Sequence, residues 1–221
     1  MADIFREVDE EVRRDKALET WERYQSWFIA AGLLIVAATG AYRAYDYYRV
    51  KAEETAGMQY EAAVQTARAG KSAEAQAALE AVAKTGPDGY KSLALMRDAG
   101  LIAAGDPAGG VAAFDALAKN PALAAPFQDV ARLRAALLRA DEADAKEMSA
   151  RLEPMAGDGK PYRHTARELL AVAAIKAGDL AAAGRWLDQM IVDPQTPADA
   201  RKRAEELSGL VLSGKPATAA K

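Results

Sequence analysis

An uncharged run of 18 residues, Gln25–Tyr42, constrains the fold of this chain more than any other feature of its sequence. A helix needs about 20 apolar residues to cross the hydrocarbon core of a bilayer, and about 17 is the lower limit. Tryptophan and tyrosine gather at both ends of the run, as they do in the aromatic belts of membrane helices. The run therefore predicts one transmembrane helix over residues 25–44. The flanking aromatic residues are Trp21, Tyr24, Trp27, Tyr42, Tyr45, Tyr47 and Tyr48.

Two other interpretations of the run stay open. A cleavable signal peptide begins with a short basic leader. Residues 1–24 instead carry five basic and eight acidic side chains, although Ala38–Ala41 supplies small residues for cleavage. The run could also be the buried core helix of a soluble protein, but such helices rarely carry aromatic clusters at both ends.

Basic residues near the run predict its orientation. Within about 20 residues, five precede the run and three follow it, and the side richer in Lys and Arg tends to stay in the cytoplasm. The N-terminus is therefore expected in the cytoplasm, and the domain after the run is expected to be exported.

The composition favours helices and leaves little material for a Ser-His-Asp catalytic arrangement. Alanine, the best helix former and a poor strand former, accounts for 54 of the 221 residues. The chain has no cysteine and one histidine, which excludes disulfides, zinc ribbons and iron–sulfur sites. Its net charge of −3 does not suggest a nucleic-acid surface. We expect an all-α protein that is not an enzyme and has no catalytic, cofactor-binding or metal-binding residues.

Four segments after the run share one register. They begin at Gly70, Gly105, Ala143 and Gly178, at spacings of 35, 38 and 35 residues. Apolar or small residues recur 5, 9 and 12 positions after each start, which is one face of an α-helix. The register therefore predicts the same helix four times. The three columns are Ala75, Gly110, Met148 and Ala183; Leu79, Phe114, Leu152 and Leu187; and Val82, Leu117, Met155 and Met190.

A second helix completes each unit. Helical composition precedes the later segments, at about residues 89–104, 125–139 and 161–176, and Gly- and Pro-containing turns separate the runs. A helix–turn–helix period near 35 residues is the length of a tetratricopeptide repeat, and the Gly-Asp starts resemble that of the second helix of this repeat. The first-helix signature is poor, so an irregular alanine-rich bundle stays an alternative. A last helix, Ala198–Leu212, would cap the array.

The expected fold is a single transmembrane helix followed by a tetratricopeptide-like α-solenoid of helix pairs. The helix is expected to continue beyond the membrane as a stalk, because no Gly/Ser linker follows the run. This organisation has five parts: a charged cytoplasmic segment (1–24), the transmembrane helix (25–44), a helical stalk with the first repeat helix (45–69), the repeat domain (70–213) and a loose tail (214–221).

The sequence contains no convincing catalytic, phosphate-binding or metal-binding motif. His164 stands alone and is interpreted as a surface or packing residue. The glycines of Gly105–Gly110 lack the Lys-Ser/Thr pair of a P-loop and a preceding strand. Asp141, Glu142 and Asp144 lie at a helix start and are interpreted as capping residues rather than metal ligands. Scattered basic residues could contact an acidic partner but are interpreted as solvated: Arg132, Arg134, Arg139, Arg201, Lys202 and Arg203.

Three stretches carry a resemblance to a known family: Asp3–Asp15, Trp21–Tyr24 and Arg163–Leu170. With the single span and the repeats, they resemble the YfgM-like ancillary subunits of the SecYEG translocon in the alphaproteobacterial form. The resemblance implies a bacterial inner-membrane protein with a cytoplasmic N-terminus and a periplasmic repeat domain. It also implies association with the SecYEG translocon, periplasmic chaperones or exported polypeptides. The family's partner surface has no motif, so the protein-binding residues are unknown.

Independently of that resemblance, an array of helix pairs offers a groove for another polypeptide, and a membrane tether raises its local concentration at the bilayer. The first hypothesis is a membrane-anchored interaction scaffold that assists exported proteins. The second is a cell-envelope assembly or division coordinator acting through the same domain. The third, a membrane-anchored enzyme, has no catalytic constellation to support it.

Overall fold

The computed structural model describes the backbone of residues 2–214 and the side chains of residues 13–16 and 18–214. This part of the chain folds into nine α-helices and contains no strand, which confirms the expected all-α class. The loose tail expected at 214–221 lies outside the described residues except for Gly214. The helices are α1 (Ala2–Arg68), α2 (Ser72–Thr85), α3 (Asp88–Gly105), α4 (Pro107–Ala118), α5 (Ala125–Arg139), α6 (Ala145–Ala156), α7 (Arg163–Lys176), α8 (Leu180–Val192) and α9 (Ala198–Leu212).

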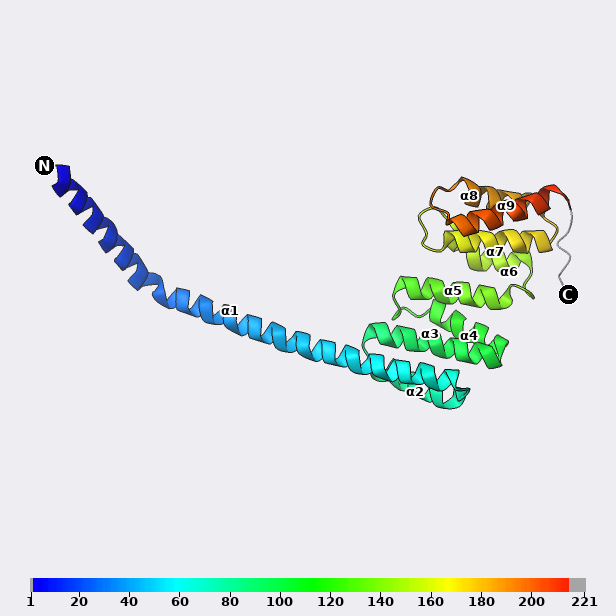
Figure 1. The fold of residues 1–221 in the computed structure, drawn as a ribbon, viewed down its shortest axis with the longest axis horizontal. Helices are drawn as coiled ribbons and strands as arrows, with labels where there is room; N and C mark the ends of the chain where they lie inside the picture. The colour runs from blue at the N-terminus through cyan, green and yellow to red at the C-terminus, as the bar shows by residue number, and fades with distance from the viewer. Residues whose placement is uncertain (1, 215–221) are drawn as a thin grey trace. The chain divides into compact units, whose positions relative to one another are not determined.

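Helix α1 is continuous through the uncharged run and into the repeats, as the sequence predicted (Figure 1). Its sequence is rich in alanine and contains no proline, so nothing interrupts its hydrogen-bond ladder. By length and composition it could cross a membrane, and no residue of its most apolar stretch is buried. Trp27 is 75% exposed and Val36 is 70% exposed. The run is therefore not a core helix packed against other described residues.

Internal contacts divide the chain into two units, with the boundary between Thr55 and Ala56. The first unit holds most of α1. The second holds the end of α1 and all the later helices, and it contains the buried core. The finer domain boundaries expected from the sequence stay predictions.

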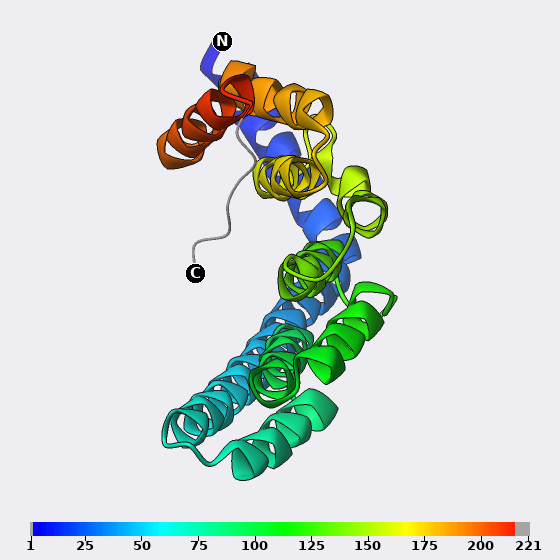
Figure 2. The same cartoon turned by 90° about the vertical axis from the view of Figure 1, so that its right-hand side faces the viewer.

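The second unit is an array of helix pairs. Consecutive helices pack on one another from α2 to α9, and α3 also contacts α5 as α7 contacts α9. Buried clusters also join α1 with α3 and α5 with α7. The first helices of the pairs are the end of α1, then α3, α5, α7 and α9, and we call them the first-helix layer. Helices α2, α4, α6 and α8 form the second layer, and Figure 2 shows α4 and α6 to one side of α3, α5 and α7.

The three repeat columns are buried as predicted. Leu79, Leu152 and Leu187 are fully buried, and Phe114 is 4% exposed. The columns that begin with Ala75 and Val82 are buried as well, so one face of each second helix packs in the core. The observed helices α3, α5, α7 and α9 also match the expected ranges closely. An ordered array, rather than an irregular bundle, follows from this register.

Turn and capping residues set the start of two second helices, α6 and α8. Gly178 has a φ of +76°, a left-handed conformation that suits glycine. The next residue, Asp179, accepts a hydrogen bond from the Ala182 amide at 2.8 Å and caps α8. Asp144 caps α6 in the same way through the Glu147 amide at 2.7 Å. The capping interpretation of the acidic cluster is therefore confirmed for Asp144.

Gly110 allows α3 and α4 to approach closely. It stands in the column otherwise occupied by Ala75, Met148 and Ala183, and a Cβ at this position would overlap both the Cβ and the backbone of Ala103. The two helices could accept a side chain here only by moving apart. Glycine therefore specifies the spacing of the second pair.

Replacing Gly110 with alanine is expected to destabilise the repeats by about 2 kcal/mol, because overpacking a tight helix contact costs more than the helix propensity gained. Gly209→Ala in α9 is the matched control, since its Cβ meets nothing within 4 Å. That variant should gain up to about 1 kcal/mol. Chemical denaturation followed by circular dichroism measures both; equal effects of the two changes would contradict the close-packing account.

Candidate functional site

A groove opens on the first-helix layer between the end of α1, α3 and α5. It encloses a cavity of about 520 Å³, and Phe114 of α4 contributes to its lining. Leu93 and Leu137 are 40% and 44% exposed although both belong to the repeat unit. The groove therefore presents apolar side chains to the solvent.

Helical periodicity places these side chains. On α3, Leu93, Met96 and Gly100 follow at spacings of three and four residues, so they share one face. On α5, Arg134 and Leu137 line the same cavity. Small residues on α3 leave the space that makes the surface concave: Gly100, Ala103 and Ala104.

Two arginines in the groove have no partner among the described residues. Arg97 and Arg134 have no acidic side chain within ion-pair distance and make no hydrogen bond there. The Nε atom of Arg97 is buried and unpaired. Arg132, also on α5, bonds instead to Asp129 at 2.9 Å. The groove thus combines apolar surface with positive charge that the described part of the chain does not neutralise.

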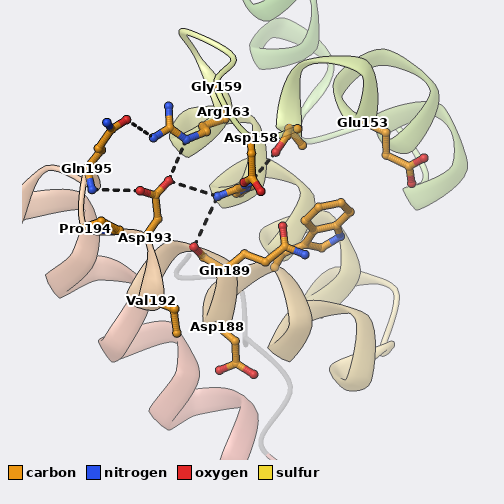
Figure 3. Close-up of a pocket in the computed structure, with 14 residues that line it drawn as sticks. Glu153, Asp158, Gly159, Arg163, Asp188, Gln189, Val192, Asp193, Pro194 and Gln195 are labelled. Carbon is orange, nitrogen blue, oxygen red and sulfur yellow. Dashed lines mark hydrogen bonds and ion pairs between the residues drawn. The ribbon is translucent and has the colours of Figure 1, made fainter.

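A larger cleft of about 1290 Å³ lies between the ends of α6 and α8 and the turns that follow them (Figure 3). Its polar wall is built from two arginines of α7, Arg163 and Arg167, spaced four residues apart on one face. Both side chains are almost completely buried. Their bonds decide whether the cleft offers free groups to a ligand.

Arg167 is satisfied by the ends of two helices. Its Nε donates to the Ala156 carbonyl at the end of α6 at 2.8 Å, and its Nη2 pairs with Asp158 at 2.6 Å. Its Nη1 faces the Gln189 carbonyl near the end of α8 at 3.4 Å and Asp193 at 3.5 Å. A cation at helix C-termini is favourable because the exposed carbonyls carry partial negative charge.

Asp193 is the centre of the network, as Figure 3 shows. Its carboxylate accepts hydrogen bonds from Arg163 Nε at 2.7 Å and from the backbone N–H of Gln195 at 2.9 Å. These bonds, the Arg163 bond first, lower the pKa of Asp193 to about 2. Arg163 also donates to Gln195 Oε1 at 2.7 Å. The polar groups of the cleft therefore bond mainly to one another and connect the α6–α7 turn to the α8–α9 turn.

Comparison with protein-family models places the chain in a family. The model described as a tetratricopeptide repeat-like domain matches residues 19–159. The chain belongs to this family. Comparisons with curated proteins and with solved structures give no match. The family match begins before the uncharged run and extends through α6, so it includes both the candidate span and the groove of this tetratricopeptide repeat-like protein.

The structure of this tetratricopeptide repeat-like protein shows where the residues considered as candidate sites in the sequence lie. His164 is a packing residue whose Nδ1 lies 3.1 Å from Thr196 Oγ1, and burial followed by the charge of Arg163 lowers its pKa. The Gly105–Gly110 segment forms the α3–α4 turn and the start of α4. Among the described side chains, no group of three or more acidic or histidine residues could hold a metal ion.

The solvated interpretation of the basic residues holds for Arg134, Lys202 and Arg203, which are exposed, and needs correction for Arg132, Arg139 and Arg201, which are partly buried. Four of the six are bonded, because the fold brings acceptors beside them: Arg132 to Asp129, Arg139 to Glu147, Arg203 to Glu168 and Arg201 to the Asp193 carbonyl. Arg134 lies in the groove. Lys202 is exposed.

Sequence reasoning missed Arg97 as a groove residue and missed the bonding role of Arg163 and Arg167. The Arg-x-x-x-Arg spacing at the start of α7 was a usable signal for the second, since it places two cations on one face beside turns rich in Asp and Gly. Nothing local marks Arg97, because its environment depends on how α1 and α5 pack around α3.

Asp193→Asn is expected to lower the melting temperature at pH 7 by a few degrees. The folded pKa of Asp193, about 2, lies below its ordinary value of 3.8, so the folded state binds its proton less readily than the unfolded state. The stabilisation is thus present above about pH 4 and is lost as the pH falls toward 2. Melting curves at several pH values should show the wild type and the variant converging over that interval. The exposed Asp188→Asn is the control, and a constant difference down to pH 2 would contradict this role.

Proposed function

We propose that this protein is a membrane-anchored interaction scaffold that associates with the SecYEG translocon and periplasmic chaperones and assists exported proteins. The observation that carries the proposal is that one family match covers a candidate membrane span and a repeat array bearing an apolar groove. Tetratricopeptide repeat-like domains act as protein-interaction modules and are typically not catalytic.

The anchor supplies location and the groove supplies contacts. An array of helix pairs presents a concave surface to polypeptides, and tethering raises the effective concentration of that surface beside the membrane. The aromatic residues at both ends of the run are exposed in the structure, as membrane-interface anchors would be. The SecYEG association itself is supported by the sequence resemblance alone.

A topology prediction follows from the Lys and Arg residues that flank the run. A periplasm-active reporter fused after Lys221 should be active, and the same reporter fused before residue 20 should be inactive. The expected location is the bacterial inner membrane with the repeat domain in the periplasm. The opposite pattern of reporter activity would place the repeats in the cytoplasm and remove the export role.

Purification of the tagged full-length protein from membranes in mild detergent, followed by protein identification, tests the function. Translocon subunits and periplasmic chaperones should be enriched over a mock purification. The alternative is a cell-envelope assembly or division coordinator, and it gains support if division or cell-wall proteins are enriched in their place.

A further inference from the structure

We infer that the groove between α1, α3 and α5 binds polypeptide segments in which Asp or Glu carboxylates alternate with apolar side chains. This inference rests on the proposed interaction function and names the chemical class of the bound segment. Its two supports are the unpaired arginines and the exposed apolar residues of the same cavity.

The charge argument begins with Arg97. A guanidinium is always charged at physiological pH, and leaving one of its buried N–H groups without an acceptor is unfavourable. The Nε of Arg97 is in that state. Arg134 on the neighbouring helix is exposed and pairs with no described acidic side chain, so its charge is open to a ligand. A ligand carboxylate would satisfy these donors, and Arg–carboxylate contacts are short, charge-assisted and often bidentate.

Most other arginines of the repeats have a carboxylate partner within the chain, which Arg97 and Arg134 lack. Arg151 makes two hydrogen bonds to Asp115, at 2.7 and 3.2 Å, and Arg203 makes two to Glu168, at 2.7 and 2.9 Å. Arg132, Arg139, Arg163 and Arg167 pair with carboxylates of the chain as well, whereas Arg201 bonds to a backbone carbonyl and its Nε is also buried and unpaired. In the groove, the acceptors must come from solvent or from a partner.

The apolar residues of the groove determine which other side chains the bound polypeptide segment should carry. Leu93, Met96 and Leu137 line the cavity beside the guanidiniums, and methionine adapts readily to different partner side chains. A volume of about 520 Å³ lies in the usual range of ligand pockets. It accommodates several side chains, so a carboxylate and its apolar neighbours can enter together. Basic segments are excluded, because their charges would face Arg97 and Arg134.

Peptide binding to the full-length protein in zwitterionic nanodiscs tests the inference. Three fluorescent 12-residue peptides share the same leucines and differ only in the intervening residues, which are Glu, Gln or Lys. Fluorescence anisotropy should show the Glu peptide binding at least about ten-fold more tightly than the Gln peptide, the difference expected from one charged hydrogen-bonded contact. The Lys peptide should bind most weakly.

Variants locate the preference. Arg97→Gln and Arg134→Gln should each reduce the Glu-over-Gln preference about ten-fold or more, whereas Arg132→Gln on the same helix as Arg134 should leave it unchanged. Leu137→Ala should weaken the Glu and Gln peptides alike. Circular dichroism of each variant confirms that the fold is retained.

The inference would be overturned by no binding of any peptide at millimolar concentration, by equal binding of the Glu and Gln peptides, or by equal effects of the Arg97 and Arg132 changes. Displacement of the Glu peptide by anionic lipid vesicles at lower concentration than by unlabelled peptide would also overturn it, in favour of a lipid ligand. The proposed function is tested separately by purification from membranes. A selective groove without translocon partners would therefore refute the function while leaving the inference intact.

Discussion

Replacing Leu152 with aspartate is expected to unfold much of the repeat array. Leu152 is fully buried and packs with Met148, Met155, Ala166 and Leu170. The change removes a core side chain, which alone costs about 2–5 kcal/mol, and places a charged group where it has no partner. The sum is comparable with the whole stability of an ordinary domain, which is about 5–15 kcal/mol.

The same change at the equivalent positions Leu79 and Leu187 should have a similar effect, because both are fully buried. Lys119→Asp is the control, since Lys119 is exposed. Lys176 is a poorer control because its Nζ donates to the Ala140 and Asp141 carbonyls. Thermal melts of residues 56–221 by circular dichroism measure these effects. Mostly harmless and unequal responses would indicate that the columns are not equivalent.

Placing two charges in the uncharged run is expected to release the protein from the membrane. On insertion scales, an arginine at the centre of a transmembrane helix costs about 2.5–3.5 kcal/mol. Leu34→Arg together with Ile35→Arg should therefore disfavour insertion by about 6 kcal/mol. Met58→Arg, an exposed site after the run, is the matched control.

Extraction of cell membranes with alkaline carbonate distinguishes the two variants. The wild type and Met58→Arg should stay in the membrane pellet, and the double variant should appear in the soluble fraction or be degraded. Retention of the double variant in the pellet would contradict the anchor. Release of the wild type itself would favour a cleaved signal peptide.

The repeat architecture was predictable because it depends on local sequence features, namely apolar residues at helical spacing and capping residues, that recur along the chain. Leu79 and Leu187 stand nine residues after the glycines of two turns, Gly70 and Gly178. One helix face buried four times leaves the same pattern four times. The caps at Asp144 and Asp179 are equally local, since each bonds to an amide three residues ahead. The continuity of α1 followed from an alanine-rich sequence without proline.

The groove was not predictable from single positions. Arg132 carries a local signal, because Asp129 lies three residues before it on α5 and pairs with it, whereas no acidic residue lies three or four positions from Arg97 on α3. The sequence does not show that the Nε of Arg97 is buried without an acceptor, because this depends on which helices pack beside α3. The Asp193 network depends likewise on contacts between residues about 30 positions apart, such as Arg163 and Asp193, which leave no periodic signal.

Site-specific photocrosslinking in living cells tests the central claim, that the groove holds polypeptide partners at the membrane. A photoreactive amino acid is placed at Leu137, inside the groove, or at Lys119, an exposed site outside it. Full-length protein with the probe at Leu137 should yield adducts with translocon components, periplasmic chaperones or newly exported chains, and the probe at Lys119 should yield few. Equal adducts from both positions, or none from Leu137, would contradict the account.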